Sequence, residues 1–520
     1  MKDHEREKPL AADSLGEAET SADSNYIPAD AWGHEHSSSV SSLRDLLRCD
    51  REAGIHDPQG SPPEDVIEAL NQDVPPPQLL SFASSFASND HEGQLEAFEG
   101  RKQKMKLGFA PAWRGMLLLA NTLLGGSGML GVPHAFSVAG YVLGTILLLL
   151  FCAASMFGSH LLACTAKKVA RAPSSFNSVS KKVVPKWAWV VDAVVMIKCA
   201  GVATSYLIIA GDLLPEALSS MGAPVARWLC VLLGWFIGAT LACFEHLTAL
   251  RYSASLVVVI VFWTAIMILV FFFAPGDQFQ PCPGYDRSPC NSAKIEAFGT
   301  NAIALLKGLP VFIFSFTCQQ NVFTVANEVK NATNLRMTGG IIIPAYVISA
   351  AFFLATALLG YFTYGDKVES DVLKNYPTTT IVAITKLAYA LVAIFSFPLQ
   401  IHPSRFSSLV LWRLVRPSRI ASDPSRYDAE QARCEKIRYW IVTSVIVLGT
   451  LAVAISVKDL GVILGIVGAT GSTTVSYILP GLVYFSCFKE RTLKRYMAIV
   501  LFAMGMVIMP TCLVVLFIKA

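Results

Sequence analysis

Long apolar stretches separated by short polar connections dominate the chain from about residue 110 onward. Eleven of them are each long enough to cross a hydrocarbon core of about 30 Å as a helix of about 20 residues. They cover residues 112–136, 139–165, 187–214, 225–245, 250–274, 300–323, 338–363, 378–401, 437–457, 460–485 and 497–518. They lack the alternation of polar and apolar residues that is typical of a membrane β-barrel. The pattern predicts an all-α polytopic membrane protein, with a transmembrane domain over residues 106–520 in the lipid bilayer.

Residues 1–105 have the opposite character. The first hundred residues hold 21 Asp and Glu against 6 Lys and Arg, and they are rich in Ser, Pro and Ala. Such a segment has too few large apolar residues to offset the entropy lost on ordering it. No apolar segment follows the charged start, so no signal peptide is expected. The sequence predicts a disordered acidic cytosolic tail over residues 1–105.

The composition narrows the class of protein further. Hydrophobic residues make up 53% of the chain and charged residues 15%, whereas ordinary soluble domains are about 25% charged. This excludes a nucleic-acid-binding protein, despite the net charge of +4. We find no phosphate-binding loop and no HExxH zinc motif, so no enzyme activity, cofactor or metal is expected. A secondary transporter is the simplest interpretation, with a channel and a receptor as alternatives.

Lys and Arg in the connections predict the orientation. With a cytosolic N-terminus, the cytosolic connections carry 26 of these residues and the opposite side carries 7. Basic residues favour the cytosolic side of a membrane. The sequence therefore predicts a cytosolic N-terminus and, with eleven spans, a C-terminus on the other side.

Cys282 and Cys290 lie in the polar 275–299 connection, on the predicted non-cytosolic side. That side is oxidising along the secretory pathway and at the cell surface. The two cysteines flank a Pro/Gly turn, so we expect a disulfide between them. The alternative is a pair of free thiols in a loop.

The first apolar stretch contains an unusual density of helix breakers. Gly126, Ser127 and Gly128 follow Asn121 and Thr122, and two more glycines and a proline lie close by. In transporters such breaks expose backbone groups near the middle of the membrane, where they bind substrate and ions. The alternative is close helix packing through small residues. The breaker density favours an unwound binding site.

The sixth stretch has a matching polar cluster, which comprises Ser315, Thr317, Cys318, Gln319 and Asn321. Amide groups are costly in hydrocarbon, so this cluster is expected to face a cavity or protein. The sixth stretch comes five spans after the first. Because five is an odd number, the second unit of five spans would cross the membrane in the inverted orientation, as in inverted-repeat transporters. The alternative is that the cluster only joins helices through hydrogen bonds.

Two titratable residues are candidates for proton coupling. Lys198 is the ionisable residue deepest within a predicted span, and such residues are functional candidates by default. His134 lies near a helix end and can titrate near neutral pH. A structural role is the alternative for each of them.

Five segments together resemble the amino acid/auxin permease family. They are GGSGMLGVPHAF (125–136), GVATSYLIIAGDLLP (201–215), FSFTCQQNVFTVANEV (314–329), SFPLQIHPSR (396–405) and GATGSTTVSYILPG (468–481). The last two are most similar to the fungal vacuolar amino acid exporters, and the sodium-coupled neutral amino acid transporters are more distant. The resemblance implies a LeuT-like five-plus-five inverted repeat with an eleventh helix, working by alternating access.

The resemblance also implies roles for particular residues. The Gly126-Ser127-Gly128 motif would hold the backbone of the amino acid, and the 317–321 motif would complete the site. Sodium-coupled members carry Asn where this chain has Thr122, and their hydroxyl partner on the eighth helix is not evident here. Protons are therefore favoured over sodium as the coupling ion.

The sequence predicts a proton-coupled secondary transporter of amino acids in a vacuolar or lysosome-like membrane. Two alternatives remain open. One is a sodium-coupled neutral amino acid importer at the plasma membrane, and the other is an amino acid sensor that signals through the acidic tail. The sequence leaves open which amino acids are carried and in which direction.

Overall fold

The computed structural model describes residues 111–169, 174–243, 251–273, 279–282, 290, 293–329, 333–415 and 424–518. The predicted acidic tail, residues 1–105, lies outside these residues. The described residues belong to one compact unit, and their regular structure is helical. The all-α prediction is therefore confirmed for this part of the chain.

Helices lie at all eleven predicted stretches. In chain order the long helices and helix pairs are α5 and α6 (Ala112–Leu124, Gly128–Ala139), α7 (Tyr141–Val169), α9 (Ala188–Ser220), α10 (Arg227–Cys243), α11 (Arg251–Phe273), α12 and α13 (Ala302–Ser315, Gln319–Glu328), α15 (Ile343–Tyr364), α16 (Thr380–Val415), α17 (Pro424–Ser456), α18 and α19 (Leu460–Val467, Leu479–Cys487) and α20 (Leu493–Phe517). Short elements of the described chain include α8 (Phe176–Val183), α14 (Asn334–Met337), η5 (Gly365–Lys367) and η6 (Val372–Asn375).

Length and composition qualify most of these helices as membrane spans. Among the described residues, eight are long and apolar enough to cross a membrane, and the bent pair α5–α6 makes nine. Two further predicted spans appear as shorter apolar helices, Arg227–Cys243 and Val257–Phe273.

Two helices extend well past their predicted ends. The sequence places a span at 378–401, but α16 continues through Pro403 to Val415. The sequence starts another span at 437, but α17 begins at Pro424. Hydropathy detects the part of a helix that suits hydrocarbon, whereas the helical backbone also continues through polar residues outside that layer.

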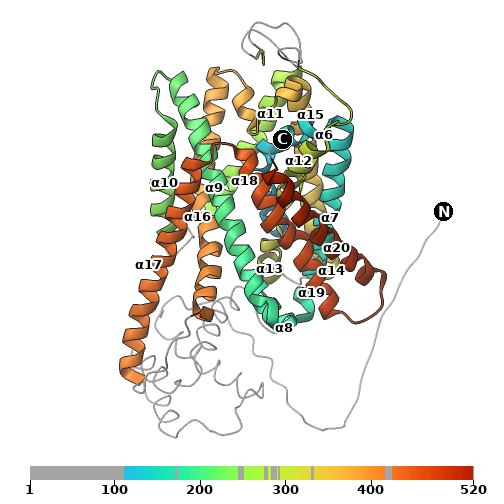
Figure 1. Ribbon diagram of the computed structural model, residues 1–520, viewed down its shortest axis with the longest axis vertical. Helices are drawn as coiled ribbons and strands as arrows, with labels where there is room; N and C mark the ends of the chain where they lie inside the picture. The colour runs from blue at the N-terminus through green and yellow to red at the C-terminus, as the bar shows by residue number, and fades with distance from the viewer. Residues whose placement is uncertain are drawn as a thin grey trace, which may run out of the picture. The chain divides into compact units, whose positions relative to one another are not determined.

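Helix α9 lies at the centre of the packing. It makes its most extensive contact with α16, and α10 and α17 lie alongside this pair (Figure 1). On the other side of the unit, α6 packs against α12 and α15, and α19 packs between α7 and α20. The broken pairs α5–α6 and α12–α13 are thus held inside the bundle.

Large apolar side chains also cover outward faces. Phe236 on α10, Val259 on α11 and three valines on α20, at 500, 507 and 514, are each more than 60% exposed. Soluble proteins rarely expose apolar surface on this scale, and such surface marks contact with a membrane or another protein. These faces suit contact with lipid tails.

In the part of the chain that the structure describes, three segments are wound as π-helix, with about one extra residue per turn. They are η4 (Thr338–Ile342), η7 (Gly468–Ser472) and η8 (Thr474–Ile478). Such turns are rare and often lie at functional sites. The glycines of η7 permit close packing, because a Cβ on Gly468 would collide with the carbonyl oxygen of Pro310.

Candidate functional site

The first span breaks in its middle, where the sequence has its cluster of glycines. Helix α5 ends at Leu124, α6 begins at Gly128, and the two helices are bent by 53°. A Cβ on Gly125 would lie 2.5 Å from the side chain of Val257, so that position requires glycine. A Cβ on Gly126 would meet no atom closer than 3.8 Å. A methyl group at Gly126 would therefore fit in ordinary van der Waals contact.

The sixth stretch breaks opposite the first. Helix α12 ends at Ser315 and α13 begins at Gln319. A Cβ on Gly128 would lie 2.7 Å from the hydroxyl oxygen of Ser315 and 2.9 Å from its Cα. Asn321 Nδ2 donates a hydrogen bond of 2.7 Å to Thr122 Oγ1. The two breaks are thus in direct contact, and a polar bridge joins their helices.

A small cavity lies beside this contact. Its lining comprises Thr122, Leu123, Gly126, Gly128, Lys198, Val202, Tyr206, Phe314, Ser315, Thr317, Gln320 and Gln400. It leaves about 20 Å³ for the centres of water-sized molecules, which is room for about one water. An amino acid is larger, so the cavity must widen before one can bind.

The structure brings half of the predicted substrate-binding residues to this cavity. Those that line it are Thr122, Gly126, Gly128, Ser315 and Thr317. Those that lie outside its lining are Asn121, Ser127, Cys318, Gln319 and Asn321. Several residues of the second group instead use their polar atoms for hydrogen bonds between helices.

Gln319 is fully buried, and its amide is taken up by the surrounding helices. Nε2 donates to the carbonyl oxygen of Ser155 at 3.1 Å and to the hydroxyl of Tyr346 at 3.2 Å. Oε1 accepts from Ser476 Oγ at 2.8 Å. Gln319 therefore connects α13 with α7, α15 and η8.

Ser127 and Cys318 also make contacts within the bundle. The hydroxyl oxygens of Ser127 and Ser205 lie 2.9 Å apart, which ties the first break to α9. Cys318 Sγ donates to the hydroxyl of Tyr346 at 3.3 Å. Asn121 differs, because its Oδ1 is buried and has no hydrogen-bond partner among the described residues.

Gln320 is a cavity residue that the sequence interpretation missed. Its side chain lines the cavity, and its Oε1 is buried with no hydrogen-bond partner among the described residues. Buried acceptors are normally satisfied, so this oxygen is available to a bound donor. Successive residues of a helix point about 100° apart, which separates the roles of Gln319 and Gln320.

Lys198 carries the only charged side chain in the described lining of the cavity. It is 3% exposed and forms no ion pair with any described residue. Its stem lies against η7, where a Cβ on Gly471 would collide with it. An unpaired buried cation is costly, so an anionic group in the cavity would be favoured.

His134 does not join Lys198. Its Nδ1 lies 2.8 Å from the carbonyl oxygen of Val368. A carbonyl can only accept, so Nδ1 carries the hydrogen in this contact. His134 thereby ties α6 to the segment that follows α15, and it does not line the cavity.

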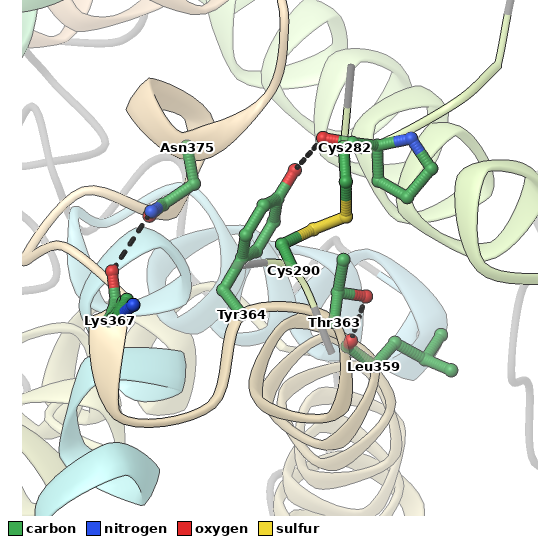
Figure 2. Close-up of a disulfide and its surroundings, with 8 residues drawn as sticks. Cys282, Cys290, Leu359, Thr363, Tyr364, Lys367 and Asn375 are labelled. Carbon is green, nitrogen blue, oxygen red and sulfur yellow. Dashed lines mark hydrogen bonds between the residues drawn. A yellow bond between two sulfur atoms is a disulfide. The ribbon is translucent and has the colours of Figure 1, made fainter. Parts of the chain in front are cut away.

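Cys282 and Cys290 form a disulfide, as the sequence predicts, with their Cα atoms 5.4 Å apart. Figure 2 shows the bond beside the end of α15. There the hydroxyl of Tyr364 donates to the carbonyl oxygen of Pro281 at 3.3 Å. We call this end of the bundle the disulfide end.

Within the described residues, no group of three or more His, Cys, Asp or Glu side chains could hold a metal ion.

The family described as "Transmembrane amino acid transporter protein" matches residues 110–518. The chain is 32% identical over 385 residues to "Vacuolar amino acid transporter 5" of Schizosaccharomyces pombe, covering 73% of this chain and 85% of that protein. It is 29% identical over 446 residues to "Vacuolar amino acid transporter 6" of Saccharomyces cerevisiae, covering 77% and 97%.

A more distant relative carries a different name. The chain is 23% identical over 380 residues to "Sodium-coupled neutral amino acid transporter 7" of Rattus norvegicus, covering 71% of this chain and 77% of that protein. The family match spans nearly all the described helices and both breaks. The chain is therefore a multi-pass membrane protein that belongs to the transmembrane amino acid transporter family.

Proposed function

We propose that this protein is a secondary active transporter that carries amino acids across a vacuolar or lysosome-like membrane by alternating access. The observation that carries the proposal is the cavity at the meeting point of two broken helices, bordered by the backbone of Gly126 and Gly128. Breaks of this kind supply substrate sites in secondary transporters. The names of the two fungal relatives support amino acids as the substrate and the vacuole as the compartment.

The amino acid carboxylate would bind at the start of α6. The first amides of a helix have no partner within it, and the helix dipole favours an anion there. The cap residue Ser127 makes no side-chain capping bond to these amides. Lys198 faces the same cavity and would add a positive charge.

The amino group of the substrate would bind at the second break. Gln320 Oε1 is a buried acceptor that faces the cavity and lacks a partner among the described residues. An ammonium group supplies three donors. Thr317 and Ser315 border the same space, so the polar ends of an amino acid are matched on both sides of the cavity.

We further propose eleven spans, with the first ten arranged as a five-plus-five inverted repeat and a cytosolic N-terminus. The broken pairs α5–α6 and α12–α13 form the first and sixth predicted spans, and the two repeats would start at these spans. The small cavity supports alternating access, because binding requires the two breaks to separate. The acidic tail would then lie outside the transport machinery.

Protons are proposed as the coupling ion. Thr122 occupies the position that a sodium site would use, and its hydroxyl already donates to the carbonyl oxygen of Leu118 at 2.8 Å and accepts from Asn321. That oxygen is therefore committed to the protein. Lys198 and His134 remain the sequence-based candidates for the titrating group.

Flux measured in proteoliposomes under imposed gradients tests the proposal. We expect amino acid uptake to follow a pH gradient and to persist when choline replaces sodium. One pH unit is worth about 1.4 kcal/mol per proton, so two units would concentrate a singly coupled substrate about a hundredfold. Flux that requires sodium and ignores a collapsed pH gradient would favour the sodium-coupled importer instead. Flux that is lost on deletion of residues 1–105 would favour a role for the tail.

A further inference from the structure

A buried carboxyl group lies at the disulfide end, away from the cavity. Asp371 precedes the short turn η6, whose Val372 and Leu373 are fully buried. This turn packs against α6 and α9. The turn thus rests on the second half of the first broken span.

Asp371 itself is fully buried, and only one of its oxygens is satisfied. Oδ1 accepts a hydrogen bond from the backbone amide of Leu373 at 3.0 Å. Oδ2 is buried and has no partner among the described residues. An ionised carboxylate in such a place is costly, whereas a protonated one is not.

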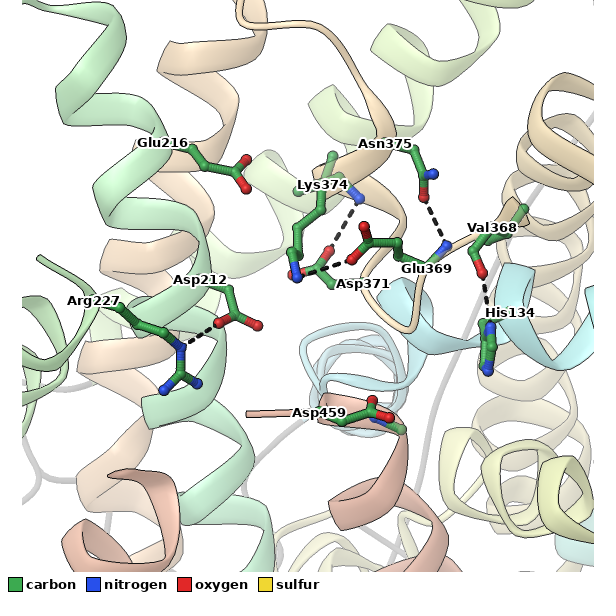
Figure 3. A network of polar contacts seen from close by, with 12 residues as sticks. His134, Asp212, Glu216, Arg227, Val368, Glu369, Asp371, Lys374, Asn375 and Asp459 are labelled. Atoms are coloured by element: carbon green, nitrogen blue, oxygen red, sulfur yellow. Dashed lines mark hydrogen bonds and ion pairs between the residues drawn. The ribbon is translucent and has the colours of Figure 1, made fainter. Parts of the chain in front are cut away.

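The charged neighbours of Asp371 pair with one another, and Figure 3 shows the pairs Arg227–Asp212 and Lys374–Glu369. Arg227 Nε donates to Asp212 Oδ1 at 2.8 Å, Lys386 Nζ to Glu216 Oε2 at 2.7 Å, and Lys374 Nζ to Glu369 Oε2 at 2.9 Å. Other titratable groups of the described residues around the turn are Tyr376 at its end, Tyr389 on α16, His134 on α6 and Asp459 at the start of α18. Among these described carboxylates, those of the three ion pairs each have a cation, and Asp371 has none.

Burial raises the pKa of Asp371 to about 7, and the negative charge of Asp212 contributes in the same direction. The amide of Leu373 and the charge of Lys374 oppose this rise, and the charge of Glu216 adds to it. The raised pKa means that this site stabilises the carboxyl group of Asp371 in its neutral form. Packing of the η6 turn against α6 and α9 is therefore favoured at low pH. This packing is weakened as the pH rises from the ordinary carboxyl range to about 7.

We propose that Asp371 is a proton-binding residue at the disulfide-end mouth of the transporter, and that its neutralisation lets the η6 turn close on α6 and α9. When Asp371 ionises, it repels Asp212 and Glu216 across this contact and the turn lifts. Because α6 also borders the cavity and is tied to Val368 through His134, lifting the turn would free α6 to move. The inference rests on the proposed alternating access, and it assigns a role to a residue that the sequence analysis did not single out.

Labelling of a cysteine placed in the η6 turn measures how often the turn opens away from α6 and α9. Val372→Cys is a small change at a fully buried position, and a membrane-impermeant maleimide would be applied from the disulfide end. Maleimide reacts with the thiolate, whose fraction also rises with pH, so each rate is divided by that of a model peptide thiol at the same pH. We expect this relative labelling rate to rise about tenfold per pH unit up to about pH 7 and to level off above it. In the same background, Asp371→Asn should give a relative labelling rate that does not depend on pH, because the amide keeps the Oδ1 acceptor but cannot ionise.

The matched control is Glu369→Gln, which removes a half-exposed acid from the same segment. This variant should keep the pH dependence of the parent. A relative labelling rate of Val372→Cys that is constant between pH 5 and pH 8 would overturn the proposal. The same pH dependence with and without Asp371→Asn would also overturn it.

Transport separates this inference from the proposed function. With full-length protein in proteoliposomes, exchange should slow as the pH at the disulfide end rises toward about 7 and should level off above it, because the turn then no longer closes on α6 and α9. Asp371→Asn should abolish that dependence while keeping the acid-pH rate within about threefold. Absence of amino acid exchange in the parent would refute the proposed function. Exchange in the parent with an unchanged pH profile in Asp371→Asn would refute only the role of Asp371.

Discussion

The two broken helices differ in what surrounds each break. At α5–α6 the backbone of Gly126 borders the cavity, and a Cβ there would meet no atom closer than 3.8 Å. At α12–α13 the side chain of Gln319 is held by three hydrogen bonds to neighbouring helices. The first break therefore offers backbone groups to a substrate. The second break is fixed by side-chain bonds and leaves Gln320 free to bind.

The largest effect is expected at the first break. Gly126→Leu should lower amino acid exchange at least about a hundredfold, because the new side chain would occupy the cavity. Expression and thermal stability should stay near the parent values, since the Cβ itself meets no close neighbour. Gly126→Ala is the control, and it should retain a large part of the activity. Exchange at the parent rate in the leucine variant would remove Gly126 from the site.

The second break should separate binding from stability within one pair of residues. Gln320→Leu should raise KM by about tenfold or more, because a hydrogen bond to a charged group is worth about 1.5–3 kcal/mol. The melting temperature should not fall, since Gln320 Oε1 has no partner to lose among the described residues. An unchanged KM would show that the amino group binds elsewhere.

Gln319→Leu should show the reverse pattern. This substitution removes the hydrogen bonds to Ser155, Tyr346 and Ser476, and we expect the free energy of unfolding to fall by about 1–3 kcal/mol. Thermal unfolding in detergent would measure this loss, and KM should change by less than about threefold. A large rise in KM with unchanged stability would mean that the two glutamines had exchanged roles.

Gly128→Ala tests the contact between the breaks. The added methyl group would press on Ser315, and overpacking of this kind costs about 1–3 kcal/mol. Thermal unfolding should show the loss, and Gly449→Ala, where a Cβ meets no atom within 4 Å, is the matched control. Equal stability of the two variants would mean that the breaks separate easily.

The smallest effect is expected from Thr122→Val. It removes the hydroxyl that accepts from Asn321 Nδ2, a loss of about 1 kcal/mol. The sodium independence of transport should be unchanged, because the hydroxyl serves the bridge between the breaks. A variant whose transport changes its response to sodium would contradict that assignment and point to a cation site at Thr122.

The sequence predicts the features that depend on local chemistry. The apolar stretches locate the helices, the glycines locate the first break, and the loop cysteines locate the disulfide. The ends of α16 and α17 escape the prediction, because hydropathy does not report where a helical backbone ends in water. The π-turns escape as well, since no local pattern distinguishes them from α-helix.

The details of the site depend on packing that is remote in sequence. Gln319 and Gln320 are chemically identical neighbours, and only the phase of α13 decides which one faces the cavity. Asp371 lies in a polar segment that has the composition of an exposed loop. Its burial arises from α6 and α9, which are more than 150 residues away along the chain. The candidate residues can thus be named from sequence, but their division between binding and support cannot.

The π-helical turns give the tenth predicted stretch a place where a residue can be lost. A π-turn holds about one residue more than the α-helical turn that it replaces. Loss of a single codon within Gly468–Ser472 would therefore let the turn revert to an α-helix and would keep Ser476 opposite Gln319. Loss of a codon within a regular α-helix such as α9 would instead rotate all that follows in that helix by about 100°. At this turn the number of residues should therefore tolerate more evolutionary change than in the regular helices.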